Sequence, residues 1–313
     1  MRLLKLDGLI NVYKEKGYTS FDVVAKLRGI LHQKKIGHTG TLDPDAEGVL
    51  PVCLGKATKL CEMLTDKDKV YEALIKLGVR TDTQDMSGTV LGTKGYAGDV
   101  STIENTIRSF EGSMEQIPPM YSAVKMNGKK LYELARKGIT VERQPRNITV
   151  YYINVKNINL DGGYISIETC VSKGTYIRTL CEDIGKALGC DACMAELKRT
   201  RSGAFQIADS IKLDGIAKLA AEDRISEALT GVDEVFSMPA VILNKDADRY
   251  MRNGNEIRSS MFHMLDDRPD RKAFLNTGAD DICVYFSDRT FGAVYRKTGR
   301  DGDPGRYKVF KMF

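Results

Sequence analysis

The chain has 313 residues, 42% of them hydrophobic and 28% charged, which excludes a disordered or collagen-like chain and allows about two domains. No apolar stretch approaches the ~20 residues that a membrane-spanning helix needs, so no membrane association is expected. The 47 basic and 42 acidic residues leave a net charge of +5, which by itself selects no class of partner.

The hydrophobic pattern predicts a mixture of strands and helices in the first 230 residues. Thr19 or Ser20 can cap the first helix, and the Asp-Gly-Gly turn at 161–163 is typical of a hairpin. Strands are expected at residues 9–13, 71–77, 149–160 and 164–171, and helices at residues 20–31, 176–188 and 212–229. Because the two do not alternate regularly, we predict an α+β fold with a mixed or antiparallel sheet.

The character of the sequence changes beyond Met238-Pro239. Short β-prone runs, separated by turns rich in Gly and Asp, stand at residues 241–243, 282–286, 291–296 and 307–310. They predict a small β-rich terminal domain. We place the boundary near 232–240, which gives a first domain at 1–236 and a second at 237–313.

The N-terminal segment does not resemble an export signal, because Lys5 and Asp7 interrupt its short apolar runs. The seven cysteines are therefore expected to be free thiols in a reducing cytoplasm. Cys190 and Cys193 form one C-x-x-C pair, but a structural zinc ion needs four ligands, so no metal is expected.

Basic residues gather in two places. Seven lie between positions 124 and 146, namely Lys125, Lys129, Lys130, Arg136, Lys137, Arg143 and Arg146. Lys198, Arg199 and Arg201 form a second cluster. Either run alone is as well explained by a solvated face, but two runs beside other RNA signals favour contact with phosphate.

The segment GHTGTLDPDAEG at 37–48 carries three glycines, a proline, a histidine and three carboxylates. Such a composition predicts a shaped loop rather than a helix or a central strand. It lacks the spacing of a dinucleotide-binding or P-loop motif, and a calcium loop would need a glutamate where Leu54 stands. From these residues alone, one aspartate could simply cap a turn while the others are solvated.

This loop, with the LGKATK segment at 54–59, resembles the catalytic loop of the TruB family of tRNA pseudouridine synthases. Further segments resemble family motifs in the family order, namely RTDTQDMSG at 80–88, IPPMYSAVKMNGKKLYELARKG at 117–138 and SKGTYIRTL at 172–180. The resemblance covers roughly residues 7–205 and implies a PUA-like RNA-binding domain at the C-terminal end. It also implies a cofactor-free isomerase that converts a T-loop uridine of tRNA, position 55, to pseudouridine.

The resemblance assigns residues to the catalytic site. By this resemblance, the nucleophilic aspartate of the family falls on Asp43. A carboxylate suits that role, because it can attack the sugar or the uracil. Tyr71 matches the tyrosine expected to stack on the target uracil, and Arg178 matches the arginine that keeps the aspartate ionised and oriented. Tyr176 is expected beside Arg178, and Leu197 is expected to pack on the base.

Other residues are assigned to RNA binding. A T-loop uridine must be flipped out of the folded tRNA, at a cost of about a few kcal/mol. His38 matches the family histidine that takes over stacking from the extruded bases, although a loop histidine bonded to the backbone is the alternative. The basic segment near 117–146 resembles a flexible RNA-gripping insertion. The residues expected to contact RNA are Lys14, Lys129, Lys130, Arg136 and Lys137.

One position departs from the family pattern Lys-Pro-x-Gly-x-Thr-Ser. Here Glu15 replaces the proline that follows Lys14, which removes a residue that would stiffen the turn. The rigidity of this turn is therefore open, whereas the nucleophile is unaffected.

Three other hypotheses compete with this assignment. A non-catalytic RNA-binding protein would use the basic clusters but would not need Asp43, Tyr71 and Arg178 together. A guide-RNA-dependent enzyme resembling dyskerin would not carry the bacterial-type insertion. A zinc-dependent base deaminase would need an H-x-E motif, which the sequence lacks. We therefore expect tRNA as the partner, no guide RNA, and a monomer.

Overall fold

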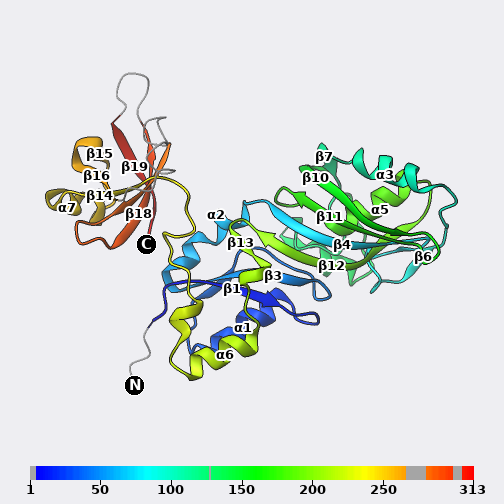
Figure 1. Cartoon of the computed structure of the whole chain (residues 1–313), viewed down its shortest axis with the longest axis horizontal. Helices are drawn as coiled ribbons and strands as arrows, with labels where there is room; N and C mark the ends of the chain where they lie inside the picture. Colours follow the sequence, from blue (N-terminus) through cyan, green and yellow to red (C-terminus); the bar gives the residue numbers. More distant parts are fainter. Residues whose placement is uncertain (1–4, 127, 266–279, 299–304) are drawn as a thin grey trace.

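The computed structural model describes residues 5–126, 128–265, 280–298 and 305–313 (Figure 1). These residues form a large sheet with helices packed on it and a smaller β-rich unit at the C-terminal end. Within the described ranges, no helix is both long and apolar enough to cross a membrane. The predicted α+β class is confirmed, with a β-rich second domain.

The large sheet is antiparallel except for one pair of strands. Its strands are β1 (Gly8–Lys14), β2 (Ile36–His38), β3 (Glu47–Leu54), β4 (Lys69–Leu77), β7 (Gly112–Gln116), β10 (Arg146–Asn159), β11 (Tyr164–Val171), β12 (Ala192–Ser202) and β13 (Phe205–Gln206). The order is β1-β3-β12-β4-β11-β10-β7, with β2 beside β3 and β13 beside β12. Strands β3 and β12 run parallel, and this pairing joins the two halves of the sheet.

The described residues also form two small two-stranded ribbons and seven α-helices. The ribbons pair β5 (Arg80–Thr81) with β6 (Val90–Gly92), and β8 (Lys125–Met126) with β9 (Lys129–Lys130). The helices are α1 (Ser20–Ile30), α2 (Cys61–Thr65), α3 (Val100–Arg108), α4 (Leu131–Ala135), α5 (Ile177–Ala187), α6 (Leu213–Ala221) and α7 (Asp248–Arg252). In Figure 1, α3 and α5 lie by the β10-β11-β4 part of the sheet, and α1 and α6 lie together by β1.

Local signals in the sequence explain where several elements begin and end. Thr19 and Asp22 form a capping box at the start of α1, which satisfies two backbone N–H groups that would lack partners. The hairpin predicted around 161–163 is present as β10 and β11. The helix predicted at 212–229 is interrupted, because Asp223 adopts a positive φ of 56° after α6 and the chain resumes as a 3-10 turn at Ile225–Ala228.

The C-terminal unit is a six-stranded sheet with α7 packed against it. Its strands are β14 (Ala240–Leu243), β15 (Ile257–Arg258), β16 (Phe262–Met264), β17 (Asp281–Tyr285), β18 (Phe291–Lys297) and β19 (Arg306–Met312), in the order β15-β19-β18-β17-β14-β16. One apolar cluster joins it to the first unit, since Leu9 and Phe205 share that cluster with Ile242 and Val294. The β-prone runs expected beyond residue 240 are therefore strands.

Candidate active site

The backbone around Asp43 is anchored on the side that faces α1. The Ser20 hydroxyl accepts the Leu42 N–H at 2.8 Å and lies 3.2 Å from the Leu42 carbonyl oxygen. The Gly17 N–H donates to the Pro44 carbonyl at 2.9 Å. The residues before and after Asp43 are thus both fixed, which restricts where its side chain can point.

Lys14 anchors the same loop from the protein interior. Its Nζ donates to the carbonyl oxygens of Pro44 at 3.1 Å and Ala46 at 2.6 Å, and its side chain is fully buried. Burial lowers the pKa of Lys14 to about 8, while the Asp43 carboxylate acts in the opposite direction. The expectation that Lys14 contacts RNA is therefore corrected: the loop carbonyls need a buried donor, and Lys14 supplies it.

The turn after Lys14 is held without the proline of the family pattern. Glu15 places its carboxylate 3.0 Å from Lys212 on the outside and its carbonyl oxygen 3.2 Å from the Lys14 ammonium on the inside. Together with the bond from Gly17 to the loop, these contacts tie the turn at both ends.

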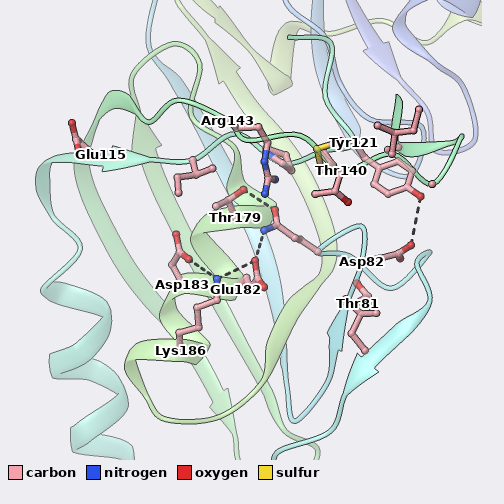
Figure 2. A pocket seen from close by; sticks show the side chains of 18 residues that line it. Thr81, Asp82, Glu115, Tyr121, Thr140, Arg143, Thr179, Glu182, Asp183 and Lys186 are labelled. Atoms are coloured by element: carbon pink, nitrogen blue, oxygen red, sulfur yellow. Dashed lines mark hydrogen bonds and ion pairs between the residues drawn. The ribbon is translucent and has the colours of Figure 1, made fainter. Parts of the chain in front are cut away.

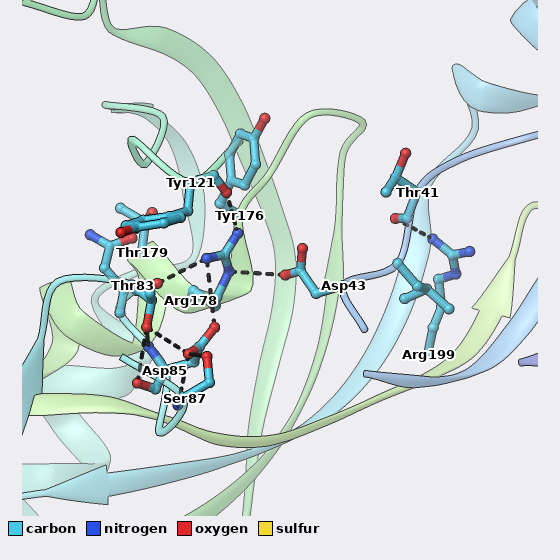
Figure 3. A network of polar contacts seen from close by, with 12 residues as sticks. Thr41, Asp43, Thr83, Asp85, Ser87, Tyr121, Tyr176, Arg178, Thr179 and Arg199 are labelled. Carbon is cyan, nitrogen blue, oxygen red and sulfur yellow. Dashed lines mark hydrogen bonds and ion pairs between the residues drawn. The ribbon is translucent and has the colours of Figure 1, made fainter. Parts of the chain in front are cut away.

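Arg199 is a second buried cation beneath the loop. Its Nε donates to the Val49 carbonyl at 2.7 Å, and its two Nη atoms lie 3.5 and 3.3 Å from the carbonyls of Thr41 and Gly40 (Figure 3). Only 1% of Arg199 is exposed. The backbones of β3 and β12 also approach each other closely at Gly48 and Arg199. This approach requires a glycine at position 48, where φ is 107° and a Cβ would stand 2.2 Å from the Arg199 carbonyl oxygen.

The other two members of that basic cluster are also paired within the protein. Lys198 lies 3.1 Å from Glu47, and Arg201 lies 2.5 Å from Asp68. The phosphate contacts expected of the cluster at 198–201 are therefore wrong for Arg199, and the charges of its two neighbours are already matched by carboxylates.

Asp43 and Arg178 meet at the centre of Figure 3. The Arg178 Nε lies 2.9 Å from Asp43 Oδ2, and its Nη atoms donate to the carbonyls of Thr83 and Tyr121, both at 2.8 Å. Arg178 is buried at 6% side-chain exposure, whereas the Asp43 side chain is 39% exposed. The guanidinium is thus fixed from three sides and presents one edge to a carboxylate that solutes can reach.

Two opposing effects set the protonation of Asp43. The surrounding protein excludes water, and this desolvation raises the pKa of Asp43 above the ordinary carboxyl value. The positive charge of Arg178 opposes that rise, as does its hydrogen bond. The pair can therefore hold an ionised, directed carboxylate in a poorly solvated place, which is what a carboxylate nucleophile needs.

Asp85 is a further member of the network that the sequence assignment missed. Its Oδ2 lies 3.6 Å from Arg178 Nη1, and its Oδ1 accepts hydrogen bonds from the hydroxyls of Thr83 and Ser87, both at 2.6 Å. Arg178 therefore stands between two carboxylates. The signal was present, because Asp85 belongs to the RTDTQDMSG segment at 80–88.

Gln84 ties that segment to the helix that carries Arg178. Its φ is +64°, an unusual conformation for a residue other than glycine. Its side-chain oxygen accepts from the Thr179 hydroxyl at 2.7 Å, and its amide nitrogen donates to Glu182. Both partners lie on α5, so the segment at 80–88 and the helix hold each other in register.

A pocket of about 640 Å³ lies next to this network (Figure 2). Its walls come from α5, including Thr179 and Glu182, and from the segment that follows β7, including Tyr121 and Arg143. Neither Asp43 nor Arg178 lines it, so the pocket adjoins this pair rather than containing it.

Tyr71 and Leu197 lie in the core cluster that reaches the Asp43 loop. Tyr71 in β4 is 8% exposed and stands opposite Thr169 of β11 and Arg199 of β12. Leu197 is also 8% exposed, and both side chains share their cluster with Leu42, the residue before Asp43. Both positions are therefore part of the hydrophobic core that the loop at 37–48 also joins through Leu42.

Tyr176 precedes α5 and is fixed through its backbone. The Gln116 side chain accepts its N–H at 2.8 Å and donates to its carbonyl at 3.1 Å. Burial raises the pKa of the Tyr176 phenol. Since Arg178 lies two residues further on, this clamp from β7 also helps to place the guanidinium.

His38 ends β2 opposite Val52 and is half-buried. Its Nδ1 accepts the Gly40 N–H at 3.4 Å, the kind of backbone contact considered as the alternative to an RNA role. Burial lowers the pKa of His38, which favours the neutral imidazole. A neutral ring remains able to stack.

The basic segment at 117–146 points its charges outward. Lys129, Arg136 and Lys137 are exposed, and Lys130 is partly buried. The Arg136 guanidinium and the Lys130 ammonium each lie 5.4 Å from the centre of the Tyr132 ring. These cations are therefore placed where a polyanion could reach them.

Comparison with known proteins identifies the family. The family described as TruB family pseudouridylate synthase (N terminal domain) matches residues 28–177, and the tRNA pseudouridylate synthase B C-terminal domain matches residues 178–237. A protein of Lachnoclostridium phytofermentans named tRNA pseudouridine synthase B is 46% identical, over 98% of this chain and 100% of the relative. One of Clostridium tetani with the same name is 41% identical, over 98% and 99%.

Solved structures agree with this result. A Cbf5-Nop10-Gar1 complex contains a chain that matches with a TM-score of 0.72 and 28% identity, over 97% of this chain and 84% of that one. An H/ACA RNP bound to a substrate RNA containing 2′-deoxyuridine matches with a TM-score of 0.71 and 27% identity, over 98% and 84%. The fold and the matched segments together define an RNA-modifying isomerase. The chain belongs to the TruB family of pseudouridylate synthases.

Proposed function

We propose that this enzyme converts a uridine in the T-loop of tRNA, at position 55, to pseudouridine, with Asp43 as the nucleophile and without a cofactor. The names of its relatives support tRNA as the substrate. The observation that carries the proposal is the 2.9 Å contact between Arg178 and a partly exposed Asp43, on a loop that buried donors anchor from several sides.

The proposed reaction conserves every atom of the nucleoside. The bond from C1′ to N1 breaks, the uracil turns, and a bond from C1′ to C5 forms. The proton on C5 leaves, and N1 gains a proton. Because nothing is oxidised or reduced, the step needs no redox cofactor. A carboxylate can serve it by attack on C1′ or on C6 of the uracil, and Asp43 is proposed to provide that attack.

The neighbours of Asp43 have proposed roles in the same step. Arg178 keeps the carboxylate ionised against desolvation and sets its direction. Tyr71 is proposed to stack on the flipped uracil and to assist removal of its proton, and Leu197 to pack on the base. Their membership of the core to which Leu42 also belongs supports these roles, since that core reaches the residue before Asp43.

The rest of the molecule is proposed to hold the RNA. Flipping a nucleotide costs about a few kcal/mol, and stacking by His38 would offset part of that cost. Exposed Lys129, Arg136 and Lys137, with the partly buried Lys130, would contact backbone phosphates. The domain at 237–313 is proposed to be PUA-like and to bind RNA, and the enzyme to act as a monomer on free tRNA without a guide RNA.

Release of tritium from a T-arm hairpin labelled at C5 of uridine tests the proposal. The wild-type chain should release tritium without any added guide RNA. Asp43→Asn preserves the size of the side chain, so RNA affinity should stay within several-fold while turnover falls by at least about a thousandfold. Binding without release by the wild-type chain would favour a non-catalytic RNA-binding protein. Appreciable turnover by Asp43→Asn would refute the assignment of Asp43 as the nucleophile.

A further inference from the structure

Phe21 is the most exposed of the large hydrophobic side chains in the described chain, at 64%. It lies in the first turn of α1, whose neighbouring residues Val23 and Val24 are buried. Single exposed hydrophobic residues are common on protein surfaces and need no explanation by themselves. The position of this one relative to the catalytic loop is what sets it apart.

The first turn of α1 is bonded directly to the catalytic loop. Ser20, which precedes Phe21, holds both backbone groups of Leu42, and Leu42 precedes Asp43. Arg28, two turns along the helix, has its guanidinium carbon 6.0 Å from the centre of the Phe21 ring. The same guanidinium lies 3.4 Å from the Ile36 carbonyl oxygen, on the strand that ends with His38. The first turn of α1 is therefore bonded to the residue before Asp43, and Arg28, near the Phe21 ring, is bonded to β2.

The charge of α1 and of its connection to β2 matches a polyanion. Four exposed cations stand on α1 and in the connection to β2, namely Lys26, Arg28, Lys34 and Lys35. Asp22, the residue after Phe21, is engaged in the cap of α1 through Thr19. An exposed aromatic ring among cations is the arrangement with which proteins stack unpaired bases while holding the neighbouring phosphates.

We propose that Phe21 is a stacking platform for an unpaired T-loop base that flanks the target uridine, with Arg28 on the adjacent phosphate. This inference rests on the proposed function, because it takes the RNA to be the T-loop. It adds a contact on the α1 side of the catalytic loop, whereas the basic segment at 117–146 would hold the RNA from elsewhere.

Binding of a T-arm hairpin to three variants tests the platform. Phe21→Leu keeps an apolar side chain but removes the ring, and should weaken RNA binding by roughly fivefold to a hundredfold. Phe21→Tyr keeps the ring and should bind within about twofold of the wild type. Tyr151→Leu, at a 57% exposed aromatic residue of β10, is the control and should change nothing. With saturating RNA, kcat of Phe21→Leu should equal that of the wild type, so the loss lies in KM.

A fluorescent base separates stacking from other causes. With 2-aminopurine beside the target uridine, wild-type protein should quench the fluorescence and Phe21→Leu should not. The proposal would be overturned if Phe21→Leu bound the hairpin and quenched the fluorescence as the wild type does. It would also be overturned if Phe21→Leu and Phe21→Tyr lost RNA affinity equally. Tritium release by the wild-type chain from the same hairpin tests the proposed function separately. If it occurs while Phe21→Leu behaves as wild type, only the platform fails.

Discussion

The loop around Asp43 and the basic segment at 117–146 use the same kinds of side chain in opposite ways. Beneath the loop, Lys14 and Arg199 are buried and donate to main-chain carbonyls. In the segment, Lys129 and Lys137 are exposed. The difference follows from what each region is proposed to do. A nucleophile has to meet one atom in one geometry, whereas phosphate contacts tolerate a range of positions.

The comparison predicts its largest effect at Arg178. In Arg178→Lys the charge stays, but the planar group that contacts Asp43 and two carbonyls is lost. We expect kcat to fall by about a hundredfold or more, because loss of one oriented charge contact costs ~3 kcal/mol or more when the site is buried. Affinity for the hairpin should change by only a few-fold. Single-turnover tritium release measures the first quantity and filter binding the second.

The pH profile of the same variant gives an independent check. The proposed mechanism requires ionised Asp43, so turnover should fall as the pH drops through the pKa of Asp43, which desolvation raises. Arg178 opposes that rise, and a lysine would do so less well. The acid limb should therefore move to higher pH in Arg178→Lys. An unmoved limb, or wild-type kcat, would show that the guanidinium does not control the carboxylate.

A smaller loss is expected at Lys14, which is buried and supports the loop through its carbonyls. Lys14→Met fills the same space but leaves the carbonyls of Pro44 and Ala46 without their donor. Unsatisfied buried groups cost about 1–3 kcal/mol each, so the loop should shift and kcat should fall about tenfold. Urea denaturation should show the variant to be less stable than the wild type at pH 9.

The stability difference should also depend on pH in a defined direction. The pKa of Lys14 is about 8 in the folded chain, against 10.5 for an ordinary lysine. Between these values the unfolded state binds more protons, so the stability of the wild type should rise with pH relative to Lys14→Met across the window from 8 to 10.5. A difference that shrinks as the pH rises would contradict burial of the charged amine.

Patterns that are local in the sequence predicted the fold well. The alternation at 71–77 marks a strand, and the turn at 161–163 marks a hairpin, because a few neighbouring residues determine both. The break at Asp223 was missed because a positive φ in that residue depends on packing rather than on composition. The order of the sheet also lay beyond local patterns, since β3 and β12 meet across about 150 residues.

The same difference between local and long-range information applies to the residues of the site. The family resemblance of the loop at 37–48 indicated Asp43 and that of the segment at 172–180 indicated Arg178, and the structure places the two in contact. Charge counting failed for Arg199, and the RNA contact expected of Lys14 failed likewise, because burial of a cation depends on carbonyl partners that are distant in the sequence. Residues of the same type can therefore either support a loop or be free to bind a polyanion, and only tertiary contacts distinguish these two roles.

The smallest effect is expected in the basic segment at 117–146. Replacement of Lys129 and Lys130 by alanine should weaken hairpin binding by about tenfold at low salt and leave kcat at saturating RNA unchanged. The slope of log affinity against log salt should fall by about 1.4–1.8, because about two phosphate contacts are lost. The matched control replaces Lys94 and Lys218, two exposed lysines outside the segment, and should leave the slope as it is. If both pairs lower the slope equally, the segment has no special part in binding. If neither does, the RNA lies elsewhere.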